Sequence, residues 1–570
     1  MTLDGLTLYR IVTELKEIII GSKIEKIYQP EREEIVLLLH TSQGKKRLNL
    51  SANGGECRLG ITCSAKENPG TAPNFCMLLR KYLSSGKITD ISQMGLERIA
   101  EIKIDARDEM GFIKSYSLIC EIMGKYSNII LTLDGKVIDS IKRVPPDLSS
   151  VRQILPGITY EAPPLLKLNP LSAEETQIAK SIAADGLLSL EGISFQTAAE
   201  LEERFFNGSS DPASVLIYAK NIKSFLTQAV QSPMPVMQKN MEGLPVFFSL
   251  VPYNTFSQTG RVYFDTANEL LDGYYTERFN YISLKHKKDA LLRIIQKNIK
   301  RVEKKLKIQL ETLKEADNSE KLRLYGELLS ANIYLLKRGM KNICVLNYYT
   351  GENVIIPLDE KLSPSANVQA YFKKVGKLKN AKEIAEERSA KYKDELYYLE
   401  TLKYMTDTAK NAEDAEEVRS ELIRCGYIEQ GKKEKLPKRN DPLSSLMRFK
   451  VSDGFTVLAG KNSRQNDALT LHAAGDEDIW FHAKNIPGSH VVLFLEGREP
   501  TDAAIEDAAK IAASLCSAKS GRVEVDYVKR KNIWKANGAK PGMVLFKNQY
   551  SMIAEGGEEV LKRFYIEEEK

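Results

Sequence analysis

Three of the five histidines lie within residues 472–490, near the C-terminal end of the chain. His482 and His490 could bind a metal ion or act as acid and base, with Lys484 supplying positive charge. No cysteine accompanies this pair and the nearby carboxylates lie on one side only, which is not typical of a metal site. A polar surface for RNA or protein, including Trp480, is the favoured interpretation.

A second polar cluster, at residues 460–467, combines a glycine, cations and amides in one loop. Such a loop could grip a phosphate or a base through its donors, or it could be a simple connection between elements. On the first interpretation, the residues that bind RNA are Lys461, Asn462, Arg464 and Asn466.

In the N-terminal third of the chain, Glu97 and Arg98 precede a predicted strand, and residues 121–128 cross a turn between two others. An arginine beside a carboxylate can be a surface ion pair, which stabilises a protein little. It can also be a fork for a phosphate or a guanine edge, positioned by its acidic neighbour. The residues alone leave both interpretations open.

Positive charge is concentrated in three runs. Residues 285–307 hold ten Lys or Arg and two acids, residues 373–382 hold five Lys and no acid, and residues 519–547 hold eight bases, two acids and three aromatics. One such run is typical of a solvated helix face, but three favour a polyanion bound through many phosphates, with aromatics stacking on bases. We therefore expect large structured RNA as a partner. The cations assigned to it are Lys297, Arg301, Lys304, Lys305, Lys373, Lys374, Lys529, Arg530 and Lys531.

The elements that must position these residues begin with a mixed α+β domain at residues 1–173. An amphipathic helix starts near Asp4, a second helix covers residues 74–83, and short Ile- and Leu-rich segments predict an antiparallel sheet. Residues 174–215 resemble a helix-hairpin-helix, whose glycine turn presents N–H groups to a phosphate, although an ordinary helical hairpin fits equally well. Strands within residues 216–274 return to the first domain.

Residues 275–440 predict a long antiparallel coiled coil with a small middle domain at its tip, at about residues 319–362. Its second helix begins at Ser363, an N-cap residue followed by proline. A linker at residues 430–441 leads to an α/β module at residues 441–570. Spacings of three and four predict a seam on the first helix, formed by Leu292, Ile295, Ile299, Val302, Leu306, Leu310 and Leu313.

The chain has 570 residues, a formal net charge of +6 and seven scattered cysteines. This length indicates about three to five domains, and the cysteine pattern favours a reducing compartment over a disulfide framework. With neither a signal sequence nor a long apolar window, we expect a cytoplasmic protein without membrane contact. The common phosphate-binding and hydrolytic motifs are absent, so we expect no catalytic residue, no metal and no cofactor.

Four segments together resemble the NFACT family: residues 121–128 (Glu-Ile-Met-Gly-Lys-Tyr-Ser-Asn), 358–367 with 371–374, 460–467 and 478–490. The resemblance covers essentially the whole chain. It implies an α+β multidomain fold with an N-terminal domain like that of formamidopyrimidine-DNA glycosylases, a helix-hairpin-helix, coiled-coil arms with a middle domain, and an RNA-binding C-terminal domain called NFACT-R.

The resemblance also implies a ribosome-associated quality-control factor that is not itself an enzyme. Such proteins bind large ribosomal subunits that still carry peptidyl-tRNA. In bacteria they recruit tRNA(Ala) and add a C-terminal alanine tail that marks the nascent chain for degradation, while ribosomal RNA forms the peptide bonds. The implied partners are the large subunit, peptidyl-tRNA, tRNA(Ala) and a small RNA-binding accessory protein.

The family's tRNA-recognition motif is Asp-Arg, which falls on Glu97 and Arg98, so the acid keeps its charge and gains a methylene. Thr2 and Leu3 stand where glycosylases have a proline nucleophile followed by glutamate, which argues against glycosylase activity. The alternative function is a fibronectin-binding surface adhesin, against which the missing signal peptide weighs. The tRNA-binding residues implied by the resemblance are Glu97, Arg98, Glu121, Ile122, Met123, Lys125 and Asn128.

Overall fold

The computed structural model describes residues 3–149, 152–164, 167–206, 208, 211–429, 441–518 and 520–566. The chain forms two compact units, Met1–Ile282 and Ser283–Lys570, and each is considered by itself. Residues 430–440 of the predicted linker and Lys519 of the third basic run lie outside the described residues.

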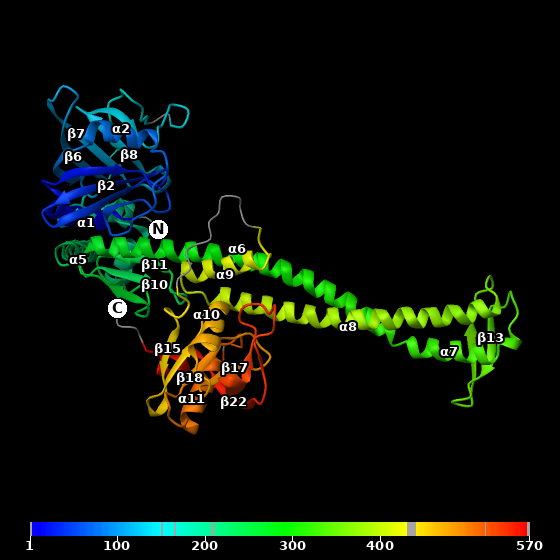
Figure 1. Ribbon diagram of the computed structural model, residues 1–570. Coiled ribbons are helices and arrows are strands. Elements are labelled where there is room, and N and C mark those ends of the chain that lie inside the picture. The colour runs from blue at the N-terminus through cyan, green and yellow to red at the C-terminus, as the bar shows by residue number, and fades with distance from the viewer. Residues whose placement is uncertain are drawn as a thin grey trace. The chain divides into compact units, whose positions relative to one another are not determined.

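An antiparallel sheet of nine strands forms the centre of the first unit (Figure 1). Its strand order is β4-β3-β2-β1-β5-β6-β7-β8-β9, so two meanders are joined where β1 pairs with β5. This confirms the predicted antiparallel sheet. The strands are β1 (Lys23–Tyr28), β2 (Glu34–Thr41), β3 (Gly44–Ser51), β4 (Arg58–Thr62), β5 (Lys87–Gln93), β6 (Ile99–Arg107), β7 (Ile113–Glu121), β8 (Asn128–Leu133) and β9 (Lys136–Ser140).

Two helices, α1 (Gly5–Ile19) and α2 (Asn74–Leu83), pack against this sheet through their apolar faces. The first begins as the sequence predicts, because the Asp4 carboxylate accepts a hydrogen bond from the Thr7 N–H at 2.8 Å and so satisfies a donor that the first turn leaves without a helical partner. Both predicted helices of this domain are confirmed.

The predicted helix-hairpin-helix corresponds to two short helices, α3 (Glu175–Asp185) and α4 (Phe195–Phe205), followed by α5 (Pro212–Gln231). Its turn packs inward, because a Cβ on Gly192 would lie 3.0 Å from the Cβ of Leu96. The Ser194 side chain already caps α4, and Glu191 N–H donates to a backbone carbonyl. These contacts fit an ordinary helical hairpin, and phosphate binding at this turn stays a prediction.

The first unit ends with a small sheet and the start of a long helix. Strands β10 (Val236–Lys239), β11 (Pro245–Ser249) and β12 (Arg261–Tyr263) form the sheet in the order β11-β10-β12. Helix α6 (Ala267–Ala316) begins before the expected residue 275, and its Asn268 Oδ1 accepts the Ile61 N–H at 3.3 Å. Its first turns therefore satisfy a donor on the edge strand β4. 

The rest of α6 lies in the second unit, beside α8 (Pro364–Thr408). Lys288 Nζ donates to the Asp407 carbonyl at 2.8 Å, and Lys382 Nζ lies 3.8 Å from the carboxylate of Asp317. Lys288 precedes Asp317 along the chain, whereas their partners follow the reverse order, with Asp407 after Lys382. The two helices therefore run antiparallel, as predicted.

The seam of this pair differs from the predicted one at both ends. Leu291 is buried whereas Leu292 is only partly buried, and Leu310 is 40% exposed. Two successive steps of four residues after Val302 turn the side chain by about 80° away from the seam, at 100° per residue. The buried seam consists of Leu291, Ile295, Ile299 and Val302 from α6 with Tyr398, Leu399, Leu402 and Met405 from α8, together with residues of α9 (Ala412–Arg424).

The small domain between the arms contains α7 (Ser319–Ala331) and a hairpin of β13 (Asn342–Leu346) and β14 (Asn353–Pro357). The two strands of the hairpin pair antiparallel, and α7 ends at Ala331. Buried residues of these elements, including Leu329, pack with Tyr371 of α8.

The C-terminal domain is a six-stranded antiparallel sheet in the order β15-β16-β18-β17-β19-β22, with α11 (Asp502–Ser514) packed against its core. The predicted α/β module is confirmed. Its other elements are β15 (Met447–Lys450), β16 (Thr456–Ala459), α10 (Ser463–Ala468), β17 (Ile479–Ala483), β18 (Val491–Phe494), β19 (Gly521–Lys529), β20 (Ile533–Trp534), β21 (Leu545–Phe546), β22 (Tyr550–Gly556) and α12 (Glu558–Phe564).

Candidate nucleic-acid interface

Arg98 lies in the turn between β5 and β6 of the first unit. The Gln93 side-chain amide donates to the Glu97 carbonyl at 2.8 Å and fixes this turn. The Arg98 carbonyl accepts the Ile122 N–H, also at 2.8 Å. The structure therefore brings together the two segments that sequence analysis assigned to tRNA, the Glu97-Arg98 pair and residues 121–128.

Glu121 is enclosed, with 1% of its side chain exposed. Both guanidinium nitrogens of Arg152 bond its carboxylate, one of them at 3.1 Å, and the Tyr160 hydroxyl donates to it at 2.8 Å. These three donors occupy most of the roughly four acceptor sites of a carboxylate. We therefore correct the expected contact of Glu121 with tRNA to a positioning role.

Ile122 and Asn128 are also buried. Ile122 belongs to the apolar core. The Asn128 Oδ1 accepts the Lys142 N–H at 3.0 Å, and its Nδ2 donates to the Lys142 carbonyl at 2.7 Å. Both residues hold the ends of the turn, so their predicted contacts with tRNA are corrected in the same way.

The middle of the turn is the part that reaches solvent. Met123 is partly exposed, Lys125 is exposed, and Tyr126 is 72% exposed. The Lys125 Nζ lies 4.8 Å from the centre of the Tyr126 ring. A cation beside an exposed ring suits a phosphate and a stacked base. Tyr126 is absent from the predicted site, although its position inside the family motif is a signal that could have found it.

Two carboxyl groups lie near the Glu97-Arg98 pair, Asp4 beside Arg98 and Glu191 beside Glu97. Burial raises the pKa of Asp4, and the positive charge of Arg98 opposes that rise, together with hydrogen bonds from two threonines. Burial also raises the pKa of Glu191, with the Glu97 charge adding to the rise. The Arg98 guanidinium therefore lies close enough to the Asp4 carboxyl to affect its pKa.

The predicted cations of the arms lie exposed along α6 and α8. Lys305 Nζ lies 5.7 Å from the centre of the Tyr392 ring of the neighbouring helix. Exposed cations spread over helices of this length suit phosphates that lie far apart. Their role in RNA binding stays a prediction for Lys297, Arg301, Lys304, Lys305, Lys373 and Lys374.

The loop at residues 460–467 is the start of α10. Asn462 caps this helix by accepting the N–H of residue 465 at 2.9 Å, and the Asn466 Oδ1 accepts the His490 N–H at 3.2 Å. Both amides are buried, so their expected contacts with RNA are corrected to roles in folding. Lys461 and Arg464 keep partly exposed side chains, and their assignment stays a prediction.

Of the three clustered histidines, His490 is buried, His482 is partly exposed and His472 is exposed. The ring of Trp480, which is 1% exposed, stacks on His482 at 5.6 Å between centroids and meets His490 edge-on at 5.1 Å. The Thr470 hydroxyl and His490 Nδ1 are 2.8 Å apart. We therefore correct the predicted RNA contacts of Trp480 and His490. The described residues contain no group of three or more His, Cys, Asp or Glu that could hold a metal ion.

Burial lowers the pKa of His482 to about 4, against the opposing effect of hydrogen bonds to backbone groups. The unfolded chain therefore binds a proton at His482 near pH 6.5 whereas the folded domain does not. The free energy of unfolding must then fall as the pH drops from 6.5 to 4, and this histidine contributes about 3 kcal/mol to the fall.

We expect the substitution His482→Gln to remove that contribution. Urea unfolding followed by tryptophan fluorescence measures it, since both tryptophans, Trp480 and Trp534, belong to this domain. Parallel pH dependences for the wild-type and variant proteins would contradict the burial of a neutral imidazole.

The cations at residues 529–531 already have protein partners. Lys529 and Lys531 each lie 2.7 Å from a carboxylate oxygen of Glu477, and these hydrogen bonds lower the Glu477 pKa to about 2. Lys484 forms a similar exposed ion pair, with its Nζ 2.6 Å from a carboxylate oxygen of Glu524. Exposed pairs stabilise little, so a phosphate can replace the carboxylate. Arg530 differs, because it donates to the carbonyls of residues 470 and 471 at 3.2 and 3.0 Å.

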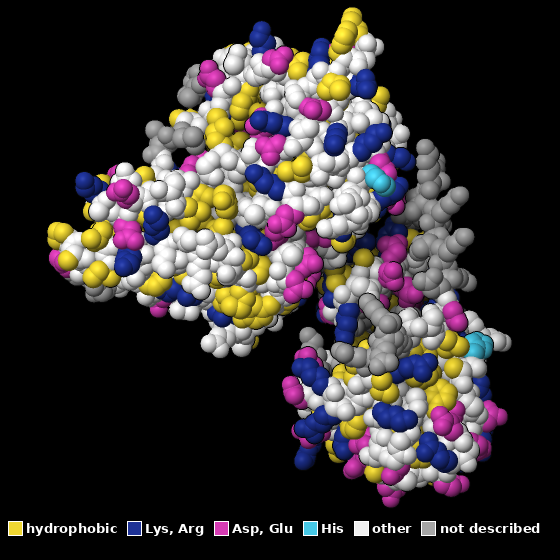
Figure 2. Space-filling model, turned by 90° about the vertical axis from the view of Figure 1, so that its left-hand side faces the viewer, with side chains coloured by type: hydrophobic (Ala, Val, Ile, Leu, Met, Phe, Trp, Pro, Cys, Tyr) yellow, Lys and Arg dark blue, Asp and Glu magenta, His cyan; other side chains and the backbone are white. Residues whose placement is uncertain are grey.

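Figure 2 shows Lys and Arg side chains interspersed with Asp and Glu on the face in view. Such a mixed surface favours contact at separate cations over one uniformly basic patch. Among the helices of the described residues, none is both long enough and apolar enough to span a membrane.

Comparisons with known proteins agree with this arrangement of domains. The family described as NFACT N-terminal and middle domains matches residues 4–441, and that described as NFACT protein RNA binding domain matches residues 446–548. The Rqc2 homolog RqcH of Bacillus subtilis is 36% identical over 567 residues, with 97% of each chain covered.

Two further relatives are more distant or partial. The ribosome quality control complex subunit NEMF of Homo sapiens is 24% identical over 58% of this chain and 33% of its own length. The solved N-terminal part of the fibronectin/fibrinogen-binding protein from Streptococcus suis is 31% identical, with a TM-score of 0.42 over 48% of this chain and 99% of that one; this likeness carries no functional argument. From the two family matches and the full-length relative, the chain belongs to the NFACT family.

Proposed function

We propose that this protein acts in ribosome quality control as an RNA-binding factor. The observation that carries the proposal is the family match, which extends through both the N-terminal and middle domains and the RNA-binding domain. The human relative is named as a subunit of the ribosome quality control complex, and it supports the same role. A factor of this kind works on ribosomes in the cytoplasm.

In its finer form, the proposal is that the protein binds large ribosomal subunits carrying peptidyl-tRNA and recruits tRNA(Ala), so that alanine is added to the C-terminus of the stalled chain. Arg98, Lys125 and Tyr126 supply a guanidinium, an ammonium and an aromatic ring on joined turns. These groups suit a phosphate and an adjacent base. They form the surface that we assign to tRNA, with Glu97 and Met123 beside them.

The protein itself need not be an enzyme in this role. Ribosomal RNA catalyses peptidyl transfer, and the protein contributes binding and orientation, which are sufficient to accelerate a step between bound partners. A small RNA-binding accessory protein would assist repeated addition. The marked chain then goes to degradation.

The arms should contribute to binding mainly through charge. We expect the combined substitution of Lys297, Arg301, Lys304 and Lys305 by alanine to weaken binding to large subunits. The plot of log binding constant against log salt concentration should become less steep by about 3, because each phosphate contact contributes roughly 0.7 to 0.9 to the magnitude of its negative slope. Filter binding or sedimentation at several salt concentrations measures this slope.

The matched control keeps the charge at the same positions by replacing the three lysines with arginine. That variant should retain the wild-type slope. If the alanine variant also retains it, α6 does not contact ribosomal RNA through these residues.

A reconstituted reaction tests the proposed function directly. Purified protein is mixed with large subunits that carry peptidyl-tRNA, aminoacylated tRNA and the accessory protein, and the nascent chain is analysed by mass spectrometry. We expect a ladder of alanine additions that is absent with empty subunits. Binding without additions would overturn the tailing role, and failure to bind the subunits would overturn the broader one.

A further inference from the structure

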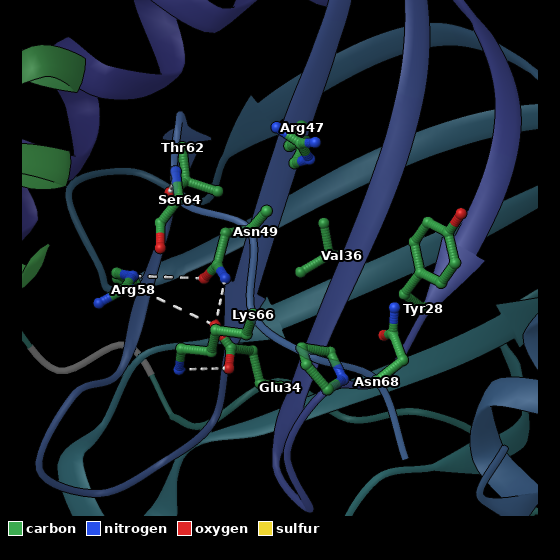
Figure 3. A pocket seen from close by; sticks show the side chains of 12 residues that line it. Tyr28, Glu34, Val36, Arg47, Asn49, Arg58, Thr62, Ser64, Lys66 and Asn68 are labelled. Atoms are coloured by element: carbon green, nitrogen blue, oxygen red, sulfur yellow. Dashed lines mark hydrogen bonds and ion pairs between the residues drawn. The ribbon is translucent and has the colours of Figure 1, made fainter. Parts of the chain in front are cut away.

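A polar cavity of about 160 Å³ lies on the first unit, where strands β1 to β4 meet the segment that follows β4 (Figure 3). Tyr28 and Asn68 lie on one side of it, and Thr62 and Ser64 lie on the other. None of the residues assigned to tRNA lines this cavity. It is therefore separate from the surface around Arg98.

The floor of the cavity is a buried network of charged and polar groups. Asn49 Nδ2 donates to the Glu34 carboxylate, and Arg58 Nε donates to Asn49 Oδ1 at 3.3 Å. Lys66 Nζ lies 2.7 Å from the second oxygen of Glu34. Glu34, Asn49 and Arg58 are 3%, 2% and 7% exposed. The floor is thus rigid, and its single carboxylate is neutralised by two cations.

The rim carries donors that the protein leaves available. Among the described residues, the Arg47 guanidinium, the Tyr28 hydroxyl and the Asn68 amide make no hydrogen bond or ion pair. Figure 3 shows Arg47 and Tyr28 at separate edges of the cavity, with Val36 between them. A ligand that fits this rim must accept hydrogen bonds and offer an apolar face to the Tyr28 ring.

The charge of the lining selects the sign of the ligand. Arg47, Arg58 and Lys66 oppose Glu34 in the lining, and Lys66 also lies 2.6 Å from a carboxylate oxygen of the adjacent Glu31, so the local formal charge is 3 − 2 = +1. A planar guanidinium beside hydroxyl and amide donors binds the oxygens of a phosphate well. A cationic or a neutral ligand would fit this set of donors less well. An aromatic ring next to the phosphate suits the base of a nucleotide.

We propose that this cavity binds the phosphate of a nucleotide, with Arg47 as the cation at the rim and the Tyr28 ring against the attached base. A free nucleotide and a nucleotide within an RNA strand share this chemistry. The loop between β3 and β4, which joins two of the strands that line the cavity, packs against the tRNA-facing turn, because a Cβ on Gly54 would lie 3.1 Å from the Cα of Lys125. Binding of a nucleotide here does not depend on the ribosomal role.

Three probes distinguish the sources: inorganic phosphate, adenosine monophosphate and a hexamer of oligoadenylate, each titrated into the full-length protein by calorimetry at low salt. We expect Arg47→Ala to lower the affinity for the bound probe about ten- to hundredfold, because a hydrogen bond to a charged group contributes about that factor to a binding constant. Lys46→Ala is the matched control, because the neighbouring residue of β3 points to the opposite face of the sheet. That variant should bind like the wild type.

Binding of the monophosphate that depends on Arg47 assigns the cavity to a free nucleotide, and binding of the hexamer alone with the same dependence assigns it to RNA. Arg47 is exposed, so its substitution should not affect folding, which thermal unfolding checks. If no probe binds, or if Arg47→Ala and Lys46→Ala bind equally well, the proposal is overturned.

Discussion

Replacing Arg98 with alanine should abolish the addition of alanine tails while leaving binding to large ribosomal subunits largely intact. The guanidinium is the charged group at the junction of the two tRNA-facing segments, where its own carbonyl accepts the Ile122 N–H. Loss of a bidentate, charge-assisted contact costs about a hundredfold in affinity. The ribosome-binding cations lie on other elements and should still act. Tail addition to a stalled reporter chain, together with sedimentation on large subunits, measures both effects.

Two variants make this test specific. Arg98→Lys keeps the charge and loses the planar fork, so it should restore only part of the activity. Arg107→Ala removes an exposed arginine from the other end of β6 and should behave as wild type. Tail addition at the normal rate by Arg98→Ala would show that Arg98 does not recognise tRNA.

Replacing Glu121 with alanine should produce the largest loss of stability among the predicted site residues. Its carboxylate, 1% exposed, is bonded by Arg152 and Tyr160. Removing one partner leaves the Arg152 charge in a largely buried place, which typically costs about 3 to 5 kcal/mol. Hydrogen exchange of β7 and β8, the strands that flank the turn, should be strongly accelerated, because their local opening requires less free energy.

The matched variant is Lys125→Ala in the same turn. The Lys125 side chain is exposed and lies beside the neighbouring Tyr126 ring, so exchange should be unchanged while tRNA binding falls. If Glu121→Ala instead exchanges like the wild type and loses only tRNA binding, Glu121 faces the RNA and the positioning role is wrong.

Much of the architecture was predictable because local signals agree with tertiary packing. Strand β6 carries period-two burial, and the second arm helix begins where the Ser363 hydroxyl accepts the Ala366 N–H at 3.3 Å. The antiparallel pairing of the arms follows from the need to bury one apolar stripe against another. The predicted seam is wrong at Leu310. Two consecutive spacings of four residues, from Val302 to Leu310, place this side chain outside the apolar stripe.

The roles of individual polar residues were less predictable. Glu121, Asn128 and His490 have the chemistry of binding residues, and only the partners that fold places beside them show that they are internal. Those partners come from distant positions in the sequence, such as Tyr160 for Glu121. Lys125 and Arg47, in contrast, are exposed. The spacing of residues in the sequence does not predict which polar side chains stay exposed in the folded protein.

Sequencing of the RNA that co-purifies with the full-length protein at moderate salt tests the central proposal most directly. The account predicts enrichment of large-subunit ribosomal RNA and of tRNA(Ala) with the wild-type protein, and loss of the tRNA alone with Arg98→Ala. Recovered RNA with the same composition as total cellular RNA, in either protein, would contradict it.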